Sequence, residues 1–355
     1  MRPLKATFNT KSFASNLERV RSIAPKSKIM AVLKANAYGH GLIEAARALS
    51  SAEGFAVLSL SEAIQLREYG FDQHLLLLEG FFSAYEIKVC SQMNIGAVIH
   101  NTQQIDFINQ IKPKNPINIH LKINTGMNRL GFLPSKIKSL IQSLENSPYI
   151  GNIILMTHFA NADISIGIKD QLTLFNTVID DRYDRSVANS AAIIRYPETH
   201  MEWVRPGIML YGASPFEDRL SKDIGLQPVM SLHSKIIAVQ NLNKGQSVGY
   251  GSTFVATKKT RVGIVACGYA DGYPRHAPSG TPILVDGKIS RTLGRVSMDM
   301  LFVDLTDISS ADIHSEVELW GANISVDEVA KEAKTVGYEL LCAISSSIRV
   351  PMEYA

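Results

Sequence analysis

The 355-residue chain lacks the features that mark disulfide-rich, metal-binding and membrane-spanning proteins. Its three cysteines, Cys90, Cys267 and Cys342, lie far apart and form neither a CxxC pair nor a metal-ligand spacing. We therefore expect no disulfide framework, and we expect the protein to reside in a reducing compartment. No stretch reaches the roughly 18 consecutive apolar residues of a membrane span, and the N-terminal segment has no apolar core of signal-peptide length. These absences predict a cytoplasmic protein without a membrane partner.

Charged residues are evenly spread along the chain, and the net charge is small. Charged residues make up 19% of the chain and hydrophobic residues 46%, with a formal net charge of +3. These values are ordinary for a globular enzyme. Because no block of like charge occurs, nucleic acid is not expected as a partner. The length allows two domains, or one large barrel with an addition.

The first two-thirds of the chain alternates between short apolar runs and amphipathic segments. The runs are rich in β-branched residues and apolar on both faces, as in parallel sheets, and the segments between them repeat with the helical period of about 3.6 residues. This alternation predicts an α/β fold, a (β/α)8 TIM barrel over residues 10–227. A doubly wound open sheet is the alternative. The predicted strands cover residues 28–35, 54–60, 74–80, 95–100, 117–124, 152–159, 185–190 and 203–210.

From about residue 228 the pattern changes. Strand-like runs are separated by Gly, Pro and Asn turns, with few helical stretches between them. Residues 326–344 have the pattern of one or two short helices. The sequence therefore predicts a C-terminal, mostly-β domain over residues 228–355. Its predicted strands lie within residues 231–240, 261–269, 281–289 and 299–306.

Several polar residues fall where a barrel would hold its active site, at the carboxyl ends of the strands. Lys34, His158, Ser190 and Arg205 lie at or near such ends, and Arg129 lies in the loop after the fifth predicted strand. Each residue alone is compatible with an ordinary polar group at a strand end. Because all of them converge on one face, we interpret the set as a candidate site.

The loops after the seventh and eighth predicted strands carry "ANSAA" and "RPGI". Barrels often bind phosphate with these two loops, and a Ser hydroxyl with Gly backbone N–H groups supplies the donors. A lysine facing a phosphate-bearing ligand, with no metal motif nearby, points to a pyridoxal phosphate Schiff base. By itself, however, "RPG" is usually only a turn.

Taken together, the motifs resemble those of alanine racemases, a pyridoxal-phosphate-dependent family of fold type III. The resemblance runs over nearly the whole chain. The segments that carry it are, in order, "AVLKANAYGHG", "LKINTGMNRLGF", "MTHFANAD", "ANSAA", "VRPGIMLYG", "VGYGSTF", "GYADGYPR", "GRVSMDM" and "RVPMEY".

The resemblance implies a barrel followed by a β domain that residues 1–9 join, with pyridoxal phosphate as the cofactor. Lys34 would hold the cofactor as an aldimine, Arg205 would hydrogen-bond its pyridine nitrogen, and His158 would stack beside the ring. The residues implied at its phosphate are Tyr38, Ser190, Gly207, Ile208 and Tyr354.

The resemblance also implies a homodimer whose active sites are shared between subunits. Arg129 would hold the carboxylate of the substrate, and Lys122 would be carbamylated and would orient Arg129. Tyr250 and Met298 would reach the site from the partner subunit. The implied entrance residues are Asp163, Arg275, Arg295 and Asp299.

One departure from the family pattern is visible. The family commonly has Asp where this chain has Asn124, which removes a charge near Lys122 and Arg129.

Racemisation removes the Cα proton from one face and returns a proton to the other, so it needs acid–base groups on both faces. The resemblance assigns Lys34 to the D-alanine face and Tyr250 to the L-alanine face. It implies that the chain supplies D-alanine for peptidoglycan, with a broad-specificity or serine racemase of the same family as the alternative.

Three other protein classes fit the sequence less well than a racemase. Arg129 argues against a decarboxylase of basic amino acids, because decarboxylation does not benefit from pinning the leaving carboxylate. The second domain and Tyr250 argue against a non-catalytic carrier of the cofactor. The polar set at the strand ends argues against a purely structural or interaction protein.

Overall fold

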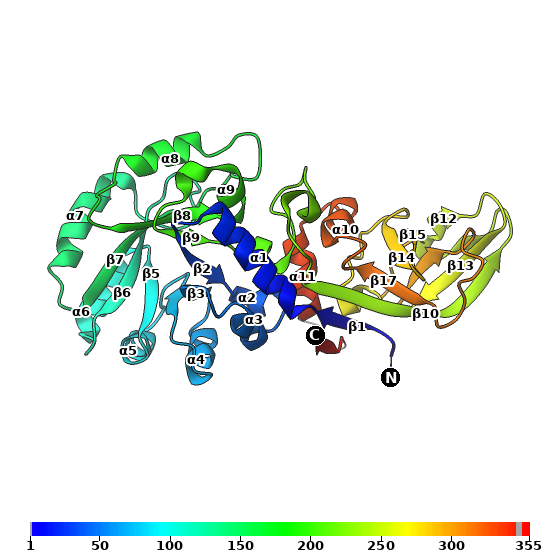
Figure 1. Ribbon diagram of the computed structural model, residues 1–355, viewed down its shortest axis with the longest axis horizontal. Coiled ribbons are helices and arrows are strands. Elements are labelled where there is room, and N and C mark those ends of the chain that lie inside the picture. Colours follow the sequence, from blue (N-terminus) through cyan, green and yellow to red (C-terminus); the bar gives the residue numbers. More distant parts are fainter. Residues whose placement is uncertain (1, 346–349) are drawn as a thin grey trace. The chain divides into compact units, whose positions relative to one another are not determined.

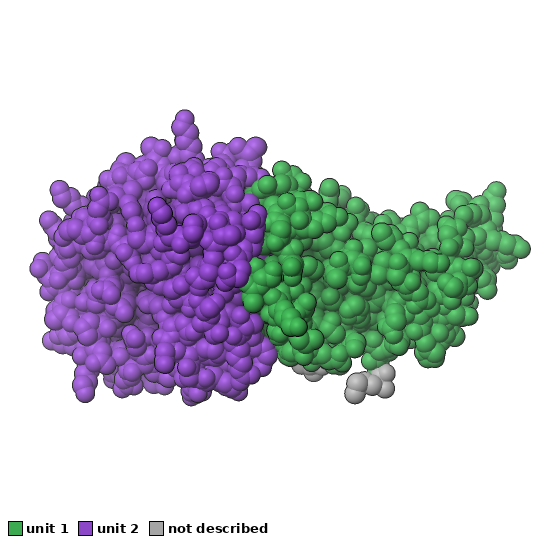
Figure 2. Space-filling model, viewed as in Figure 1, with its two compact units in different colours: residues 1–16, 38–41, 211–355 green, residues 17–37, 42–210 purple. Residues whose placement is uncertain are grey.

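The computed structural model describes residues 2–345 and 350–355. Residue Arg349 of the "RVPMEY" motif lies outside the described residues. The chain forms two compact units, coloured separately in Figure 2. Unit 1 comprises the chain up to Asn16, Tyr38–Gly41 and Tyr211–Ala355, and unit 2 comprises Leu17–Ala37 and Leu42–Leu210. The domain limits expected from the sequence, 10–227 and 228–355, stay a prediction.

Unit 2 contains a closed barrel of parallel strands, which confirms the predicted fold class and excludes the open sheet (Figure 1). Each strand pairs with the next along the chain, and the last pairs with the first. The strands described are β2 (Lys28–Val32), β3 (Gly54–Val57), β4 (His74–Leu77), β5 (Ile95–Ile99), β6 (Ile117–Lys122), β7 (Ile150–Met156), β8 (Asp184–Asn189) and β9 (Trp203–Arg205).

The barrel strands end earlier than the sequence suggests. β2 ends at Val32 and β7 at Met156, so Lys34 and His158 lie two residues beyond their strands rather than at the ends. Beyond each strand end, one more backbone hydrogen bond joins the chain to the neighbouring strand. The Leu33 N–H donates to the Ala56 carbonyl oxygen at 2.8 Å, and the Thr157 N–H donates to the Ser186 carbonyl oxygen at 3.3 Å. Both side chains therefore belong to the loops above the barrel.

Helices follow the strands and cover the outside of the barrel (Figure 1). In α7 the buried residues Ile137, Ile141 and Leu144 recur at helical spacing and form the apolar face. The helices are α1 (Thr10–Ile23), α3 (Leu42–Ala48), α4 (Leu60–Glu68), α5 (Ala84–Gln92), α6 (Thr102–Ile111), α7 (Pro134–Glu145), α8 (Lys169–Asn176) and α9 (Ser190–Arg195). The segment α2 (Lys34–Tyr38) is a left-handed turn, and 3-10 turns lie at Pro197–Thr199 and Ile208–Tyr211. α1 runs from unit 1 into unit 2.

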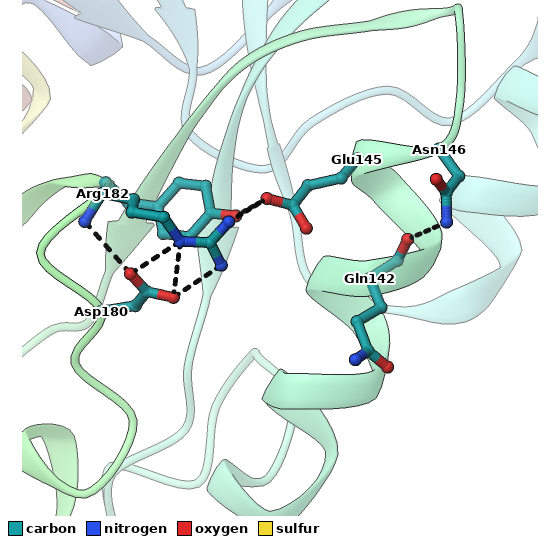
Figure 3. Close-up of polar contacts among 6 residues, drawn as sticks. Gln142, Glu145, Asn146, Asp180 and Arg182 are labelled. Carbon is teal, nitrogen blue, oxygen red and sulfur yellow. Dashed lines mark hydrogen bonds and ion pairs between the residues drawn. The ribbon is translucent and has the colours of Figure 1, made fainter.

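At the amino end of the barrel the charged groups are paired. Arg182 donates to Asp180 at 2.7 Å and to Glu145 at 2.8 Å, which ties the segment before β8 to the end of α7 (Figure 3). Lys28 stands 3.6 Å from Asp184 at the starts of two strands. This end of such barrels serves stability rather than chemistry.

Two histidines occupy the interior of the barrel near this end. The rings of His74 and His120 have centroids 5.6 Å apart, and His120 is fully buried. Three ring nitrogens have no hydrogen-bond partner among the described residues: both nitrogens of His120 and the Nε2 of His74. Burial lowers the pKa of His120 well below its usual value and the pKa of His74 to about 4. Both rings are therefore neutral at pH 7.

Unit 1 is mostly β, as predicted. Its main sheet has the order β13-β16-β15-β14-β17-β10-β1-β18, and β1 pairs with both β10 and β18. β17 (Glu316–Trp320) lies outside the predicted strands, and the single strand predicted within residues 281–289 is wrong, because a turn divides it into Pro282–Val285 and Lys288–Leu293. The strands are β1 (Lys5–Phe8), β10 (Met230–Leu242), β11 (Ser247–Val248), β12 (Phe254–Val255), β13 (Thr260–Val265), β14 (Pro282–Val285), β15 (Lys288–Leu293), β16 (Leu301–Asp304), β17 (Glu316–Trp320) and β18 (Met352–Tyr354).

The predicted helical stretch 326–344 forms two helices, α10 (Val326–Glu332) and α11 (Gly337–Ser345). Short 3-10 turns cover Ser221–Ile224, Tyr250–Ser252 and Tyr269–Asp271. Within residues 2–345 and 350–355, no helix is both long and apolar enough to cross a bilayer.

Candidate active site

Cationic side chains gather at the carboxyl end of the barrel in unit 2. Lys122, the last residue of β6, has its pKa lowered to about 7 by burial and by Arg205, Arg129 and Lys34. The same four cations, together with burial, keep the pKa of His158 well below its usual range. The charged neighbours that shift these two pKa values are all positive. The arrangement therefore favours anionic ligands.

Arg205 is held rigidly at the end of β9. Its Nη1 donates to Ser186 Oγ at 2.6 Å, and its Nη2 donates to the carbonyl oxygen of Thr157 at 2.7 Å. The side chain is buried, and burial lowers its pKa to about 9. It is still charged at neutral pH, and its Nε–H makes no hydrogen bond to the described residues. Arg205 can therefore offer a fixed donor to a ligand without giving up its proton.

Ser190 and Gly207 form a pair of hydrogen-bonding groups between β8 and β9. The Gly207 N–H donates to Ser190 Oγ at 2.9 Å. Ser190 begins α9 and Ile208 begins the 3-10 turn that follows β9, so both stand where a chain enters helical structure. All three residues are buried. Their position matches the phosphate site predicted from "ANSAA" and "RPGI".

Asn124 shapes the loop that carries Arg129. Its Oδ1 accepts from the N–H groups of Gly126 and Asn128, both at 3.1 Å, and its Nδ2 donates to Asn128 Oδ1 at 3.0 Å. The side chain thus caps a turn, a role that Asn fills without a charge. Arg129 is exposed, and it lines a small cavity with Lys122, Thr157 and His158.

Unit 1 carries a second set of candidates on its surface. The side chain of Tyr250 is 74% exposed and that of Met298 52% exposed. The Nη1 of Arg295 lies close to Gly251, since a Cβ at that glycine would stand 3.2 Å from it. The backbone of Asp299 accepts from Arg2 at 2.6 Å. Arg295 is exposed and Asp299 is half-buried.

Tyr38 and Tyr354 also belong to unit 1. The ring of Tyr38 is buried and stacks on Tyr211 at 4.6 Å, and burial raises the pKa of its hydroxyl. The ring of Tyr354 stacks on Phe8 at 4.9 Å, and its hydroxyl contacts the sulfur of Met352 at 3.7 Å. The Tyr38 hydroxyl is therefore a neutral donor at neutral pH.

The predicted residues are divided between the two units. Unit 2 holds the cationic cluster, His158, Ser190, Gly207, Ile208 and the entrance candidate Asp163. Unit 1 holds Tyr38, Tyr250, Arg275, Arg295, Met298, Asp299 and Tyr354. The meeting of the two sets in one active site is a proposal.

Sequence reasoning missed the residues that support the site. Thr157 and Ser186 hold Arg205, and Glu62 accepts the backbone N–H of Asn36 at 3.2 Å, next to Lys34. For Glu62 a signal existed, because Ser59 and Glu62 have the spacing of a helix capping box. The buried Thr157 and Ser186 gave none.

Comparison with known proteins agrees with this geometry. The family profile "Alanine racemase, N-terminal domain" matches residues 8–215, and "Alanine racemase, C-terminal domain" matches residues 229–354. An alanine racemase from Nitrosospira multiformis is 51% identical over 97% of this chain and 98% of its own length. A catabolic alanine racemase from Klebsiella aerogenes is 49% identical over 99% of each chain.

Among solved structures, the biosynthetic alanine racemase of Pseudomonas aeruginosa is similar over 100% of both chains, with a TM-score of 0.96 and 44% identity. These relatives are amino-acid racemases, and the matches cover both units. The chain therefore belongs to the alanine racemase family.

Proposed function

We propose that the protein interconverts L-alanine and D-alanine, with pyridoxal phosphate bound to Lys34 and with Lys34 and Tyr250 as the two acid–base residues. The observation that carries this proposal is the cluster of Lys34, Lys122, Arg129 and Arg205, whose mutual charge calls for anions. A phosphate ester and a substrate carboxylate are such anions.

The residues present fit pyridoxal phosphate. The Ser190 hydroxyl and the Gly207 and Ile208 backbone would bind its phosphate, with Tyr38 and Tyr354 as further hydroxyl donors. His158, which is neutral, would lie beside the ring. When bound, the cofactor withdraws electrons from the substrate Cα and so stabilises the negative charge left by proton removal.

Arg205 would donate its free Nε–H to the pyridine nitrogen. A guanidinium donates a hydrogen bond but keeps its proton, so the ring nitrogen would stay unprotonated. The withdrawal of electrons would be weaker than with a carboxylic acid at this position. The side reactions that need a long-lived carbanion would be suppressed accordingly.

Lys122 would become a carbamate. Its pKa of about 7 leaves much of the amine neutral and nucleophilic at neutral pH. The neutral nitrogen would attack the carbon of CO2, forming an N–C bond and releasing one proton. The resulting anion would orient Arg129, which would hold the carboxylate of the substrate. Asp163, Arg275, Arg295 and Asp299 would line the entrance.

The two faces of Cα require two proton carriers. Lys34 would serve the D-alanine face and Tyr250 the L-alanine face. Tyr250 and Met298 are exposed on unit 1, and we propose that a partner subunit covers them in a homodimer with shared sites. A proton delivered from one subunit and a cofactor held by the other would make the dimer the catalytic unit.

In the cell the enzyme would supply D-alanine for peptidoglycan from the cytoplasm. The relatives carry both biosynthetic and catabolic names, so breakdown of D-alanine is the second candidate role. A broad-specificity or serine racemase is the alternative activity. Rates with a panel of L-amino acids, in the presence of added pyridoxal phosphate, decide between these activities.

A complementation experiment tests both the activity and the shared site. Lys34→Ala and Tyr250→Phe should each abolish racemisation, whereas Tyr69→Phe, at another exposed tyrosine, should not. Mixed and reassembled in equal amounts, the two inactive variants should regain about a quarter of the wild-type rate, because half the dimers are hybrids with one intact site. A mixture without activity would exclude a shared site.

A further inference from the structure

The turn that begins at Lys34 has an unusual backbone. Ala35 (φ 56°, ψ 51°), Asn36 (φ 51°, ψ 49°) and Ala37 (φ 53°, ψ 54°) are all left-handed, and Tyr38 follows with a φ of 51°. Residues with a Cβ enter this region singly and at a steric cost, and rarely in succession. Strain of this kind persists only where surrounding contacts enforce it, and it clusters at functional sites.

The side chains of Glu62 and Asn36 both form hydrogen bonds to backbone at this turn, beside the backbone bond from the Ala37 N–H to the Leu33 carbonyl oxygen at 2.8 Å. The Glu62 Oε1 accepts from the Asn36 N–H at 3.2 Å, and the Asn36 Oδ1 accepts from the Leu42 N–H at 2.8 Å. Glu62 is itself fixed, because its Oε2 accepts from the N–H groups of Leu58 and Ser59, both at 3.1 Å. One carboxylate therefore joins the start of α4 to the strained backbone two residues after Lys34.

From this geometry we infer that Glu62 is a positioning residue: its carboxylate enforces the left-handed turn and so sets the position of the Lys34 amine. The inference rests on the proposed function, in which Lys34 both carries the cofactor and moves a proton. A displacement of the turn would move the amine relative to the substrate Cα. Proton transfer is sensitive to such shifts, since a misplacement of about 1 Å can cost about 100-fold in rate.

The chain contains a matched control. Glu86 occupies the same third position in α5, where its carboxylate accepts from the Phe82 N–H at 2.6 Å and its N–H donates to Ser83 Oγ at 3.4 Å. Both glutamates are partly buried helix-capping residues. The bonds of Glu86 stay within residues 82–86, however, away from the Lys34 turn.

The decisive variant is Glu62→Asp, measured in the full-length protein with added pyridoxal phosphate. Aspartate can still cap α4, but it is one methylene too short to reach Asn36 as well. We expect kcat to fall about tenfold or more, and half-saturation of the visible cofactor–lysine absorbance to need more pyridoxal phosphate. Glu62→Gln keeps the full reach but has one acceptor oxygen, so it can satisfy either the Asn36 N–H or the N–H groups of Leu58 and Ser59. It should therefore recover kcat only in part. Glu86→Asp should leave kcat and the absorbance unchanged.

The inference is wrong if Glu62→Asp retains kcat within about twofold, or if Glu86→Asp lowers kcat equally. It is also wrong if the loss of kcat follows a fall in the melting temperature, which is the result expected from a plain capping role. Failure of the proposed function has a different signature. In that case the wild-type protein would show no absorbance that depends on Lys34, whatever the Glu62 variants do.

Discussion

The buried histidine pair predicts that acid weakens the barrel. His120 is fully buried and has no hydrogen-bond partner among the described residues, so its folded-state pKa lies well below that of the unfolded chain. When the pH falls below about 6.5, His120 binds a proton in the unfolded chain but stays neutral in the folded barrel. Stability is therefore lost as the pH falls. For a ring that stays neutral down to pH 5, the loss between pH 7 and pH 5 is about 2 kcal/mol.

The substitution His120→Leu removes this pH-dependent loss of stability. Unfolding by urea, followed by the fluorescence of Trp203 in a Trp320→Phe background, reports on the barrel, because the chain has two tryptophans and Trp203 begins β9. The free energy of unfolding of His120→Leu, relative to the parent, should rise by about 2 kcal/mol between pH 7 and pH 5. Substitution of the exposed His276 should give no such gain. An equal difference between His120→Leu and its parent at both pH values would refute the reasoning.

Three further substitutions test the two ends of the barrel. Arg205→Glu should lower racemisation strongly, because the donor to the pyridine nitrogen is lost; an unchanged rate would contradict its role. Asn124→Asp adds a carboxylate near Lys122 and should raise the pKa of that lysine, moving the acid limb of the pH–rate profile upward; an unmoved limb would count against the carbamate. Arg182→Ala, at the paired amino end, should leave kcat unchanged, and a loss of kcat would show that this end takes part in catalysis.

The sequence was sufficient for the barrel because each strand is a separate apolar run with its own helix behind it. The sequence did not predict the residues at which the strands end. Leu33 continues the apolar run past Val32, and Phe159 follows the polar pair after Met156, so composition does not mark either strand end. The strand ends depend on backbone pairing with neighbouring strands, which weakens after one further hydrogen bond. The sequence also missed β17, a five-residue run between turns whose buried Glu318 breaks the apolar pattern.

The residues proposed to carry the chemistry were predictable from the sequence. The residues that hold them in position were not. Lys34, Arg129 and Arg205 are charged residues near strand ends, which is a signal in itself. The left-handed turn gives no such signal, because Ala35 and Ala37 favour a right-handed helix locally. The contact that imposes the turn comes from Glu62, in another element of the barrel. Only the folded chain brings them together.

The two ends of the barrel differ in a way that does not depend on any resemblance. At the amino end the charges of Arg182 and Lys28 are matched by carboxylates. At the carboxyl end, cations depress the pKa of Lys122, and the backbone beside Lys34 is strained.

Each of these features at the carboxyl end opposes folding, so a chain selected for stability alone would not retain them. An anionic ligand bound among the cations would relieve the repulsion, and it would stabilise the folded state in proportion to its affinity. The site is thus marked by features that destabilise the fold, and the same free energy that destabilises the empty cluster favours the phosphate and carboxylate groups that the proposed reaction brings.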